Sequence, residues 1–137
     1  MRALYVLLGD PVAHSRSPAI HARAFQLLGF DAVYAPCRIT DVLAAVRALR
    51  TLAIAGANVT VPHKQAVIAS LDRLDDAAKR IGAVSCIVNR DGVLSGHNTD
   101  REGLLRALGK FSGIFTLTFP VASHSQERSM IVTKPTH

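Results

Sequence analysis

The sequence is poor in the residues that mark several special classes of protein. Its 137 residues include no tryptophan, two cysteines and only 5% aromatic residues. Cys37 and Cys86 stand far apart and show neither metal-binding nor redox spacing, so neither a disulfide framework nor a zinc site is indicated. We expect both to be thiols in the core, which favours a cytoplasmic protein.

Long apolar runs are also missing. No stretch reaches the roughly 18 residues that a membrane helix needs. The first residues, MRALYVLL, end at Gly9-Asp10-Pro11 without a small-residue cleavage site, so a buried first strand is expected there instead of a signal peptide. We therefore expect no association with membranes.

Acidic residues are fewer than basic ones, 10 against 16, which gives a formal net charge of +6. The basic residues are spread along the chain, with no dense run and few aromatics between them. Nucleic-acid binding usually needs a clustered patch, so we expect no nucleic-acid partner. An anionic small molecule explains the excess of positive charge equally well.

What the sequence does contain is a globular composition, with 49% hydrophobic and 19% charged residues, in one domain or one domain plus a tail. The periodicity predicts strands at residues 3–8, 33–37, 55–61, 86–89 and 93–96, and helices at 17–28, after Thr40 or Asp41, and at 62–70, 75–81 and 100–108. Ser17 is expected to cap the first helix, Gly29 and Gly82 to end two helices, and Asp91-Gly92 to form a hairpin turn. This alternation predicts an open, mostly parallel α/β sheet with helices on both faces. We expect residues 1–109 to form this domain and residues 110–137 to form an irregular tail, of which the stretch 111–121 is apolar and β-prone.

Ligands of such sheets collect at the carboxyl ends of the strands. Three loops leave strands there, at residues 9–17, 59–64 and 96–100. The informative polar residues of the sequence lie in these loops, so we expect a binding site at this edge.

Lys64 is the first candidate. It follows a strand and Pro62, which places it in the first turn of the helix predicted at 62–70. A cation there opposes the helix macrodipole, so helix propensity does not explain it. Lys64 is a candidate for proton transfer; the alternative is a surface lysine after a turn.

Asp100 is the second candidate, at the start of the last predicted helix, where Thr99 and Glu102 have capping-box spacing. A carboxylate in a first turn is favourable through the dipole alone. The functional alternative is a partner for Lys64 that orients the amine and shares proton transfer to an alcohol or ketone oxygen.

Two pairs of polar residues are candidates for binding. Ser15 and Ser17 stand at a helix N-terminus, where free N–H groups and two hydroxyls suit a carboxylate; the alternative is that Ser17 serves only as the helix cap. Asn58 and Thr60 are two apart on a strand and so point to one side, toward substrate hydroxyls; the alternative is an asparagine that satisfies buried backbone groups. The histidines show no ligand spacing, so no metal site is expected.

Three segments together resemble the shikimate dehydrogenase family. They are GDPVAHSRSPAIH at residues 9–21, GANVTVPHK at 56–64, and IGAVSCIV at 81–88 continuing to GHNTD at 96–100. Their order and spacing match the N-terminal, substrate-binding domain of that family over about residues 3–108. Each motif alone is moderately specific, and the set is strongly specific.

The resemblance implies an enzyme of aromatic amino-acid biosynthesis that reversibly reduces 3-dehydroshikimate to shikimate with NADPH. It implies that Ser15 and Ser17 hold the substrate carboxylate and that Asn58 and Thr60 bind substrate oxygens. Lys64 and Asp100 would be the catalytic pair. The cofactor supplies the hydride, so the protein supplies position and the proton.

The sequence departs from the family in three places. Ser85 stands where the family usually has an asparagine that contacts a substrate hydroxyl, so the resemblance implies that Ser85 binds substrate through its shorter hydroxyl. Arg101 stands where the family commonly has glycine. The cofactor domain is missing as well, because no Gly-x-Gly-x-x-Gly turn occurs and residues 110–137 resemble nothing in it. We expect a truncated enzyme that needs a cofactor domain for turnover; the alternative is a non-catalytic module that binds shikimate-like hydroxy acids.

Overall fold

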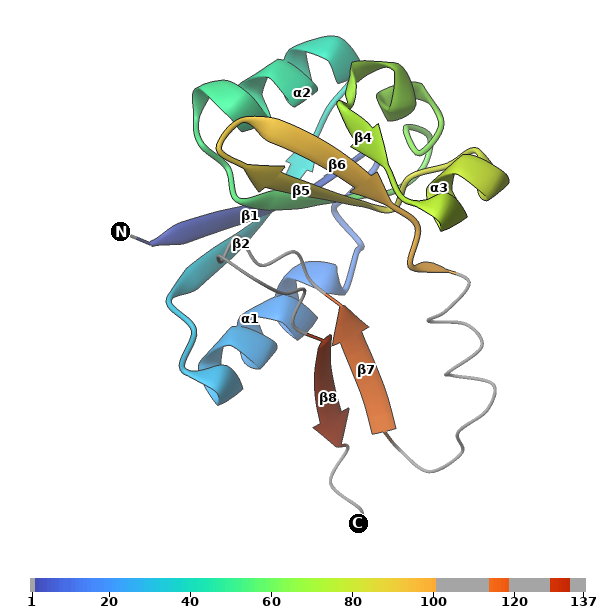
Figure 1. Ribbon diagram of the computed structural model, residues 1–137. Coiled ribbons are helices and arrows are strands. Elements are labelled where there is room, and N and C mark those ends of the chain that lie inside the picture. Colours follow the sequence, from blue (N-terminus) through green and yellow to red (C-terminus); the bar gives the residue numbers. More distant parts are fainter. Residues whose placement is uncertain (1, 101–113, 119–128, 134–137) are drawn as a thin grey trace.

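A computed structural model describes residues 2–100, 114–118 and 129–133 of the chain (Figure 1). The elements follow in this order: β1 (Ala3–Gly9), α1 (Ser17–Leu28), β2 (Ala32–Arg38), α2 (Val42–Thr51), β3 (Gly56–Val59), the 3₁₀ helix η1 (Ala66–Ser70), β4 (Arg73–Leu74), α3 (Asp76–Ile81), β5 (Cys86–Arg90), β6 (Val93–His97), β7 (Ile114–Thr118) and β8 (Ser129–Thr133).

The first six strands form one mixed sheet in the order β2-β1-β3-β5-β6-β4. β1 pairs in parallel with β2 and β3, and β4 pairs in parallel with β6, whereas β5 runs antiparallel to both β3 and β6. The predicted α/β sheet, mostly parallel, is therefore confirmed. Because β5 reverses the direction once and β6 reverses it again, the carboxyl ends of β1, β3 and β6 lie at one edge of the sheet, together with the start of β5.

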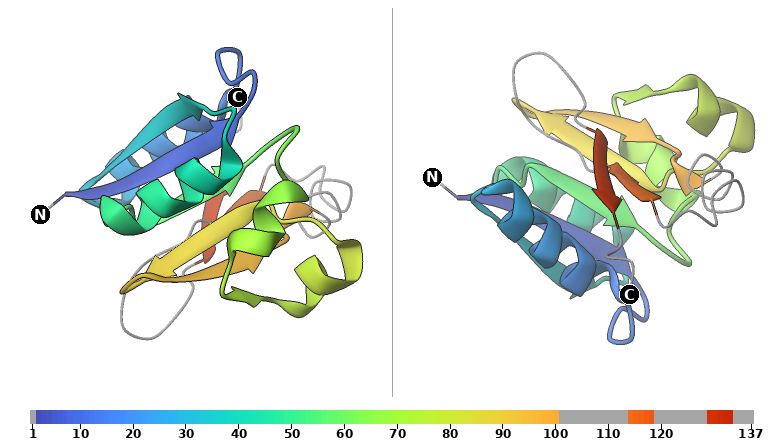
Figure 2. Two further views of the ribbon diagram at one scale, coloured as in Figure 1. Left: turned by 90° about the horizontal axis from the view of Figure 1, so that it is seen from above. Right: turned by 90° about the horizontal axis from the view of Figure 1, so that it is seen from below.

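Helices cover both faces of this sheet (Figures 1 and 2). Successive side chains of β1 point to opposite faces of the sheet, and the side chains on both faces are buried. Val6 and Leu8 join one core with residues of α2, η1 and α3, and Tyr5 and Leu7 join a second core with Phe25 of α1. The predicted helices on both faces are thus present, and each face has its own apolar core.

The short turn signals of the sequence are confirmed. The Asp41 carboxylate caps α2 by accepting from the Ala44 N–H at 3.0 Å. Gly29 and Gly82 end α1 and α3 in the left-handed conformation, at φ of 61° and 73°. Asp91 and Gly92 both take positive φ in the turn between β5 and β6, as the Asp-Gly hairpin signature predicts.

Three predictions around the first and second of the three loops are wrong. Ser17 does not cap α1 but is its first residue; Arg16 holds the cap position without a side-chain bond, and the Ser15 hydroxyl accepts from the Ser17 N–H at 3.2 Å. The strand predicted at 55–61 ends at Val59, and the helix predicted at 62–70 is only η1. The Val61–Pro62 peptide is cis, and only Val67 of η1 is buried, so no apolar face supports a longer α-helix there.

The tail also differs from its prediction. β7 lies within the apolar stretch 111–121, but β8 occupies a segment that we expected to be irregular. The two strands pair antiparallel. The apolar run of β8 is short, and its strand conformation depends on pairing with β7, more than ten residues away, so the local sequence did not predict it. Of the helix predicted at 100–108, only Asp100 belongs to the described residues. Arg101 lies outside them.

The two cysteines have different environments. Cys86 is buried and Cys37 is half-buried, and no disulfide joins them. Among the helices described, none combines the length and the apolar character that crossing a bilayer requires.

Candidate functional site

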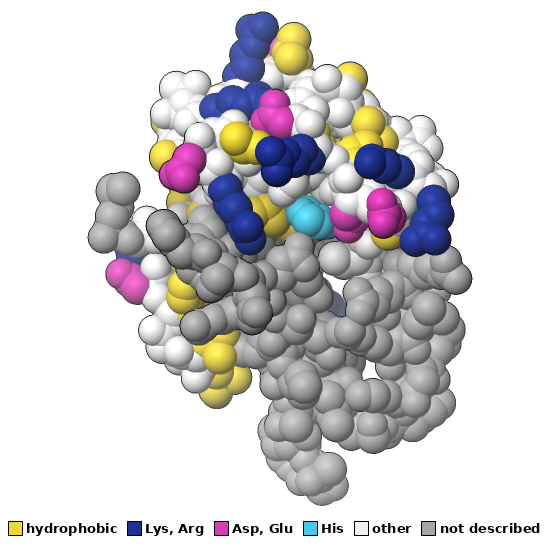
Figure 3. All heavy atoms as spheres, viewed as in Figure 1, with side chains coloured by type: hydrophobic (Ala, Val, Ile, Leu, Met, Phe, Trp, Pro, Cys, Tyr) yellow, Lys and Arg dark blue, Asp and Glu magenta, His cyan; other side chains and the backbone are white. Residues whose placement is uncertain are grey.

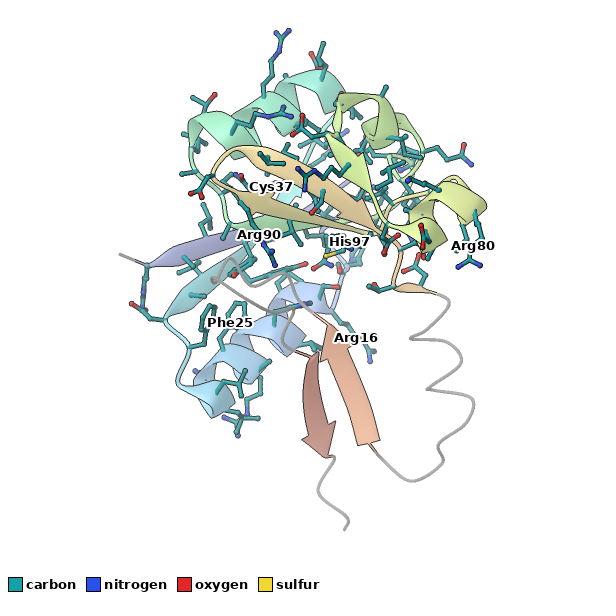
Figure 4. All side chains as sticks on the ribbon, viewed as in Figure 1. Arg16, Phe25, Cys37, Arg80, Arg90 and His97 are labelled. Carbon is teal, nitrogen blue, oxygen red and sulfur yellow. The ribbon has the colours of Figure 1, made fainter. Side chains whose placement is uncertain are left out.

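The edge that collects the strand ends is joined by backbone hydrogen bonds between its loops. These are Ile39 N–H to Gly9 O at 3.0 Å, Asp10 N–H to Val61 O at 3.1 Å, Val84 N–H to Lys64 O at 2.8 Å and Ser85 N–H to His97 O at 2.9 Å. In Figure 4, Arg16 before α1 and His97 at the end of β6 lie at this same side of the sheet. The three loops predicted to form a site therefore belong to one connected rim.

Lys64 and Asp100, 36 residues apart in sequence, are brought together at this rim: the Lys64 ammonium donates to Asp100 Oδ2. Their side chains are 30% and 53% exposed. A pair this exposed stabilises a fold by only about 0–1 kcal/mol. Stability is therefore a weak reason for the pairing, whereas an amine oriented by a carboxylate and open to solvent suits proton transfer.

The Lys64 segment is held from two sides. The neighbouring His63 is buried, and its Nε2 donates to the Ile39 carbonyl at 2.8 Å. On the other side of the segment, the Lys64 carbonyl accepts a hydrogen bond from the Val84 N–H. The sequence analysis missed this role of His63; its only signal was a histidine directly before the candidate lysine.

Asp100 is held by the residues around it. Its N–H donates to Asn98 Oδ1 at 3.1 Å, and Asn98 Nδ2 donates to the Ala83 carbonyl at 3.0 Å. Asn98 is buried, so this amide fixes the loop before the carboxylate.

Ser85 contributes to the same loop. Its hydroxyl is buried, accepts from the Thr99 N–H at 2.9 Å, and lies 3.2 Å from the Thr99 hydroxyl and 3.4 Å from the His97 carbonyl. All of these partners belong to the segment that carries Asp100. The predicted contact of Ser85 with substrate stays a prediction, while its contacts with Thr99 and His97 are structural.

The serine pair sits where α1 begins. Ser15 is exposed and Ser17 is half-buried, and the Ser15 hydroxyl uses one free N–H of the helix, that of Ser17. Pro18 has no N–H, the Ile20 N–H donates to the Arg16 carbonyl at 3.1 Å, and the Ser17 hydroxyl bonds to Tyr34, so the Ser15 hydroxyl proton is the side-chain donor that this turn offers to an anion.

Asn58 and Thr60 both reach the rim, but from different backbone settings. Asn58 is in β3, and its Oδ1 accepts from the Tyr34 hydroxyl at 2.9 Å. Thr60 follows the strand, and its N–H donates a hydrogen bond to the Leu8 carbonyl. Gly9 allows the close approach of Thr60, because a Cβ at Gly9 would lie 2.3 Å from Thr60 Cγ2.

Tyr34 and His21 form a buried pair that the sequence analysis missed. The rings stack at 4.3 Å with an interplanar angle of 8°. Burial raises the pKa of Tyr34, the nearby Cys86 adds to this, and the Ser17 hydroxyl opposes it. Burial lowers the pKa of His21, and its bond to the Ser17 carbonyl opposes that shift. Both rings are therefore neutral near pH 7.

A second histidine ties β6 to α3. His97 Nδ1 lies 3.2 Å from Asp75 Oδ2, and its Nε2 lies 3.1 Å from the Ser95 hydroxyl. Asp75 also caps α3 by accepting from the Ala78 N–H. In the ranges that the structure describes, no group of three or more His, Cys, Asp or Glu side chains is placed to hold a metal ion.

Charged side chains of the described residues are mixed on the visible face. Figure 3 shows Lys and Arg side chains interspersed with Asp and Glu over its upper part.

The site itself offers one amine, one carboxylate, one amide and several hydroxyls, which is a set suited to a small molecule carrying a carboxylate and several oxygens.

Comparison with known proteins points to one family. The family model of the shikimate dehydrogenase substrate binding domain matches residues 7–87, more than half of the chain. The NADP(+) shikimate dehydrogenase of Geobacillus sp. is 51% identical over 113 residues, which cover 79% of this chain and 40% of that protein. That of Bacillus cereus strain B4264 is 46% identical over 114 residues, or 82% of this chain and 41% of the relative.

Solved structures agree. The crystal structure of shikimate 5-dehydrogenase from Listeria monocytogenes in complex with shikimate and NAD is similar with a TM-score of 0.76 and 41% identity, over 79% of this chain and 38% of that one. The chain spans about 40% of the length of the curated relatives it matches.

Proposed function

Because this chain belongs to the shikimate dehydrogenase substrate-binding domain family, we propose that it is the substrate-binding part of an enzyme that interconverts 3-dehydroshikimate and shikimate. The observation that carries the proposal is the contact of Lys64 with Asp100 at the rim where the strand ends meet. We place the binding unit at residues 1–109 and the tail at 110–137. We further propose a cytoplasmic enzyme of aromatic amino-acid biosynthesis without a nucleic-acid partner.

Each predicted residue has a role in this proposal. Ser15 and Ser17 hold the substrate carboxylate with their hydroxyls at the start of α1. Asn58 and Thr60 bind ring oxygens, and Ser85 contributes its hydroxyl at the start of β5 or acts through the Asp100 loop. These residues lie in the loops or strand ends of one rim, which supports a shared ligand.

Lys64 and Asp100 handle the proton. In the reductive direction the Lys64 ammonium gives a proton to the ketone oxygen, and in the reverse direction the pair takes the hydroxyl proton. Asp100 orients the lysine through the hydrogen bond it accepts and stabilises its charged form. A single contact between an acid and an amine thus serves both directions.

NADP, which the names of the relatives include, finds no matching element in this chain. The 137 residues contain no Gly-x-Gly-x-x-Gly turn, so we assign no residue here to the cofactor and route no step through it. The relatives are longer, and we propose that the cofactor is bound by the part of the enzyme that this chain does not match.

Calorimetric titration with shikimate tests the proposal. We expect saturable binding that Ser15→Ala weakens, while Lys79→Ala, which changes an exposed lysine of α3, leaves it unchanged. Absence of binding to the intact chain refutes the proposal.

A second candidate function is a non-catalytic module that holds shikimate-like hydroxy acids, favoured by the missing dinucleotide turn. Adding shikimate and NADP+ to the chain and following NADPH absorbance separates the two. Binding without turnover, even when the part of a relative that this chain lacks is supplied as a separate protein, supports the module. Turnover that appears with that added part and disappears in Lys64→Ala supports the enzyme.

A further inference from the structure

Tyr34 is a buried polar residue that none of the proposed roles uses. It lies in β2, is 9% exposed, and donates its hydroxyl proton to Asn58 Oδ1 at 2.9 Å. Strand β1 separates β2 from β3, so the tyrosine ring reaches across β1 to meet the asparagine. The contact therefore links the edge strand of the sheet to a proposed substrate ligand.

His21 fixes the ring of this tyrosine. It stacks on Tyr34 almost in parallel, and its Nδ1 bonds the Ser17 carbonyl at 2.8 Å. A carbonyl only accepts, so Nδ1 carries the proton and His21 is anchored to the first turn of α1. With one ring face covered by a fixed imidazole, Tyr34 has little freedom to swing its hydroxyl away from Asn58.

The orientation of the Asn58 amide follows from this contact. An asparagine side chain has one acceptor, Oδ1, and a donor group, Nδ2. Oδ1 is occupied by Tyr34, and Nδ2 donates to no acceptor among the described residues. Asn58 is only half-buried, so the donor group is left for a ligand at the rim.

We propose that Tyr34 is a positioning residue of the substrate site: its hydroxyl holds the Asn58 amide so that Nδ2 donates to a substrate oxygen. His21 serves by holding the tyrosine ring. The inference rests on the proposed function for the identity of the ligand, a hydroxy acid whose ring oxygen accepts this bond. The orientation of the amide does not depend on that function.

The first test therefore uses the intact chain without ligand. The Asn58 side-chain NH₂ signals, identified in a ¹H–¹⁵N spectrum by their loss in Asn58→Ala, are expected to shift or broaden in Tyr34→Phe. Tyr5→Phe removes a buried tyrosine hydroxyl from the same core and is expected to leave them in place. Unchanged Asn58 signals in Tyr34→Phe overturn the proposal.

His21→Leu is the second variant, which keeps the test decisive should Tyr34→Phe fail to fold. It leaves the Tyr34 hydroxyl in place but removes the ring that holds it, so the same NH₂ signals are expected to broaden. Sharp, unshifted signals in this variant contradict the role of the stack.

The second test is a double-mutant cycle on shikimate affinity. Tyr34→Phe is expected to weaken binding about 5- to 30-fold, and Asn58→Ala by at least as much. Since Tyr34 acts through Asn58, the double variant should bind no more weakly than Asn58→Ala. Multiplicative losses overturn the positioning role. Failure of the unmodified chain to bind shikimate refutes the proposed function, and the spectra still decide the role of Tyr34.

Discussion

The Ser85→Ala substitution separates two roles of the serine that replaces the family's usual asparagine. In the structure, the Ser85 hydroxyl is the acceptor for the Thr99 N–H at 2.9 Å and touches the Thr99 hydroxyl and the His97 carbonyl. The residue is 5% exposed, so water does not readily replace these partners. If this hydroxyl holds the Asp100 loop, its loss destabilises the protein even without ligand.

The magnitude follows from the group that is left without a partner. A buried N–H that loses its acceptor costs about 1–3 kcal/mol, and the two longer contacts add little. For a chain of this size, 1 kcal/mol corresponds to a shift in melting temperature of about 2–6 °C. We therefore expect a decrease of about 1–3 kcal/mol in the free energy of unfolding.

Urea denaturation of the unliganded chain measures this change. Ser70→Ala is the matched control, because the Ser70 side chain in η1 makes no hydrogen bond in the described structure; a change within about 0.5 kcal/mol is expected. Ser85→Asn tests whether the larger amide restores the contact. Equal stability of Ser85→Ala and the unmodified chain would refute the argument and leave substrate contact as the role of this hydroxyl.

Four further predictions concern the rim and the two cores. Gly9→Ala places a methyl group against Thr60 and is expected to destabilise by about 1–3 kcal/mol and to weaken shikimate binding, measured by urea denaturation and calorimetry. Asn89→Ala removes three hydrogen bonds to backbone groups, two of them buried, so a loss of about 2–5 kcal/mol in the free energy of unfolding is expected in urea denaturation. Ser15→Ala is expected to weaken shikimate binding by about 1–3 kcal/mol, and equal affinity would restrict Ser15 to its bond with the helix. Burial lowers the pKa of His21 below its ordinary 6.5, so at mildly acidic pH the folded chain binds fewer protons than the unfolded chain. The contribution of His21 to stability is therefore full above pH 6.5 and is lost as the pH falls through the folded-state pKa. Urea denaturation at a series of pH values should show a smaller acid-induced loss of stability in His21→Gln.

Much of the fold follows from local sequence. The buried run of β1, the glycine after α1, the Asp41 cap and the Asp-Gly turn each have a mechanism that acts within a few residues, and each is confirmed. The helix predicted at 62–70 is wrong because its weak apolar alternation provides no continuous apolar face, and Val67 is the one buried residue of η1. Periodicity over so few residues does not separate a 3₁₀ turn from an α-helix.

The site was predictable as far as topology determines it. Strand order explains why Lys64 and Asp100 meet at one edge, although the 36 residues between them carry no such information. Side-chain partners across the sheet were not predictable. Tyr34 and Asn58 are 24 residues apart on strands that are not neighbours, so no local pattern announces their bond.

The backbone bonds that join the loops of the rim limit how this site can be altered. Each of the four bonds fixes the length of two loops at once, so inserting a residue into one loop misaligns its neighbour. Changes of ligand preference on this scaffold are accordingly expected to proceed by exchanging side chains at fixed positions. A library built for a new hydroxy acid should vary residue identity and leave every loop its present length.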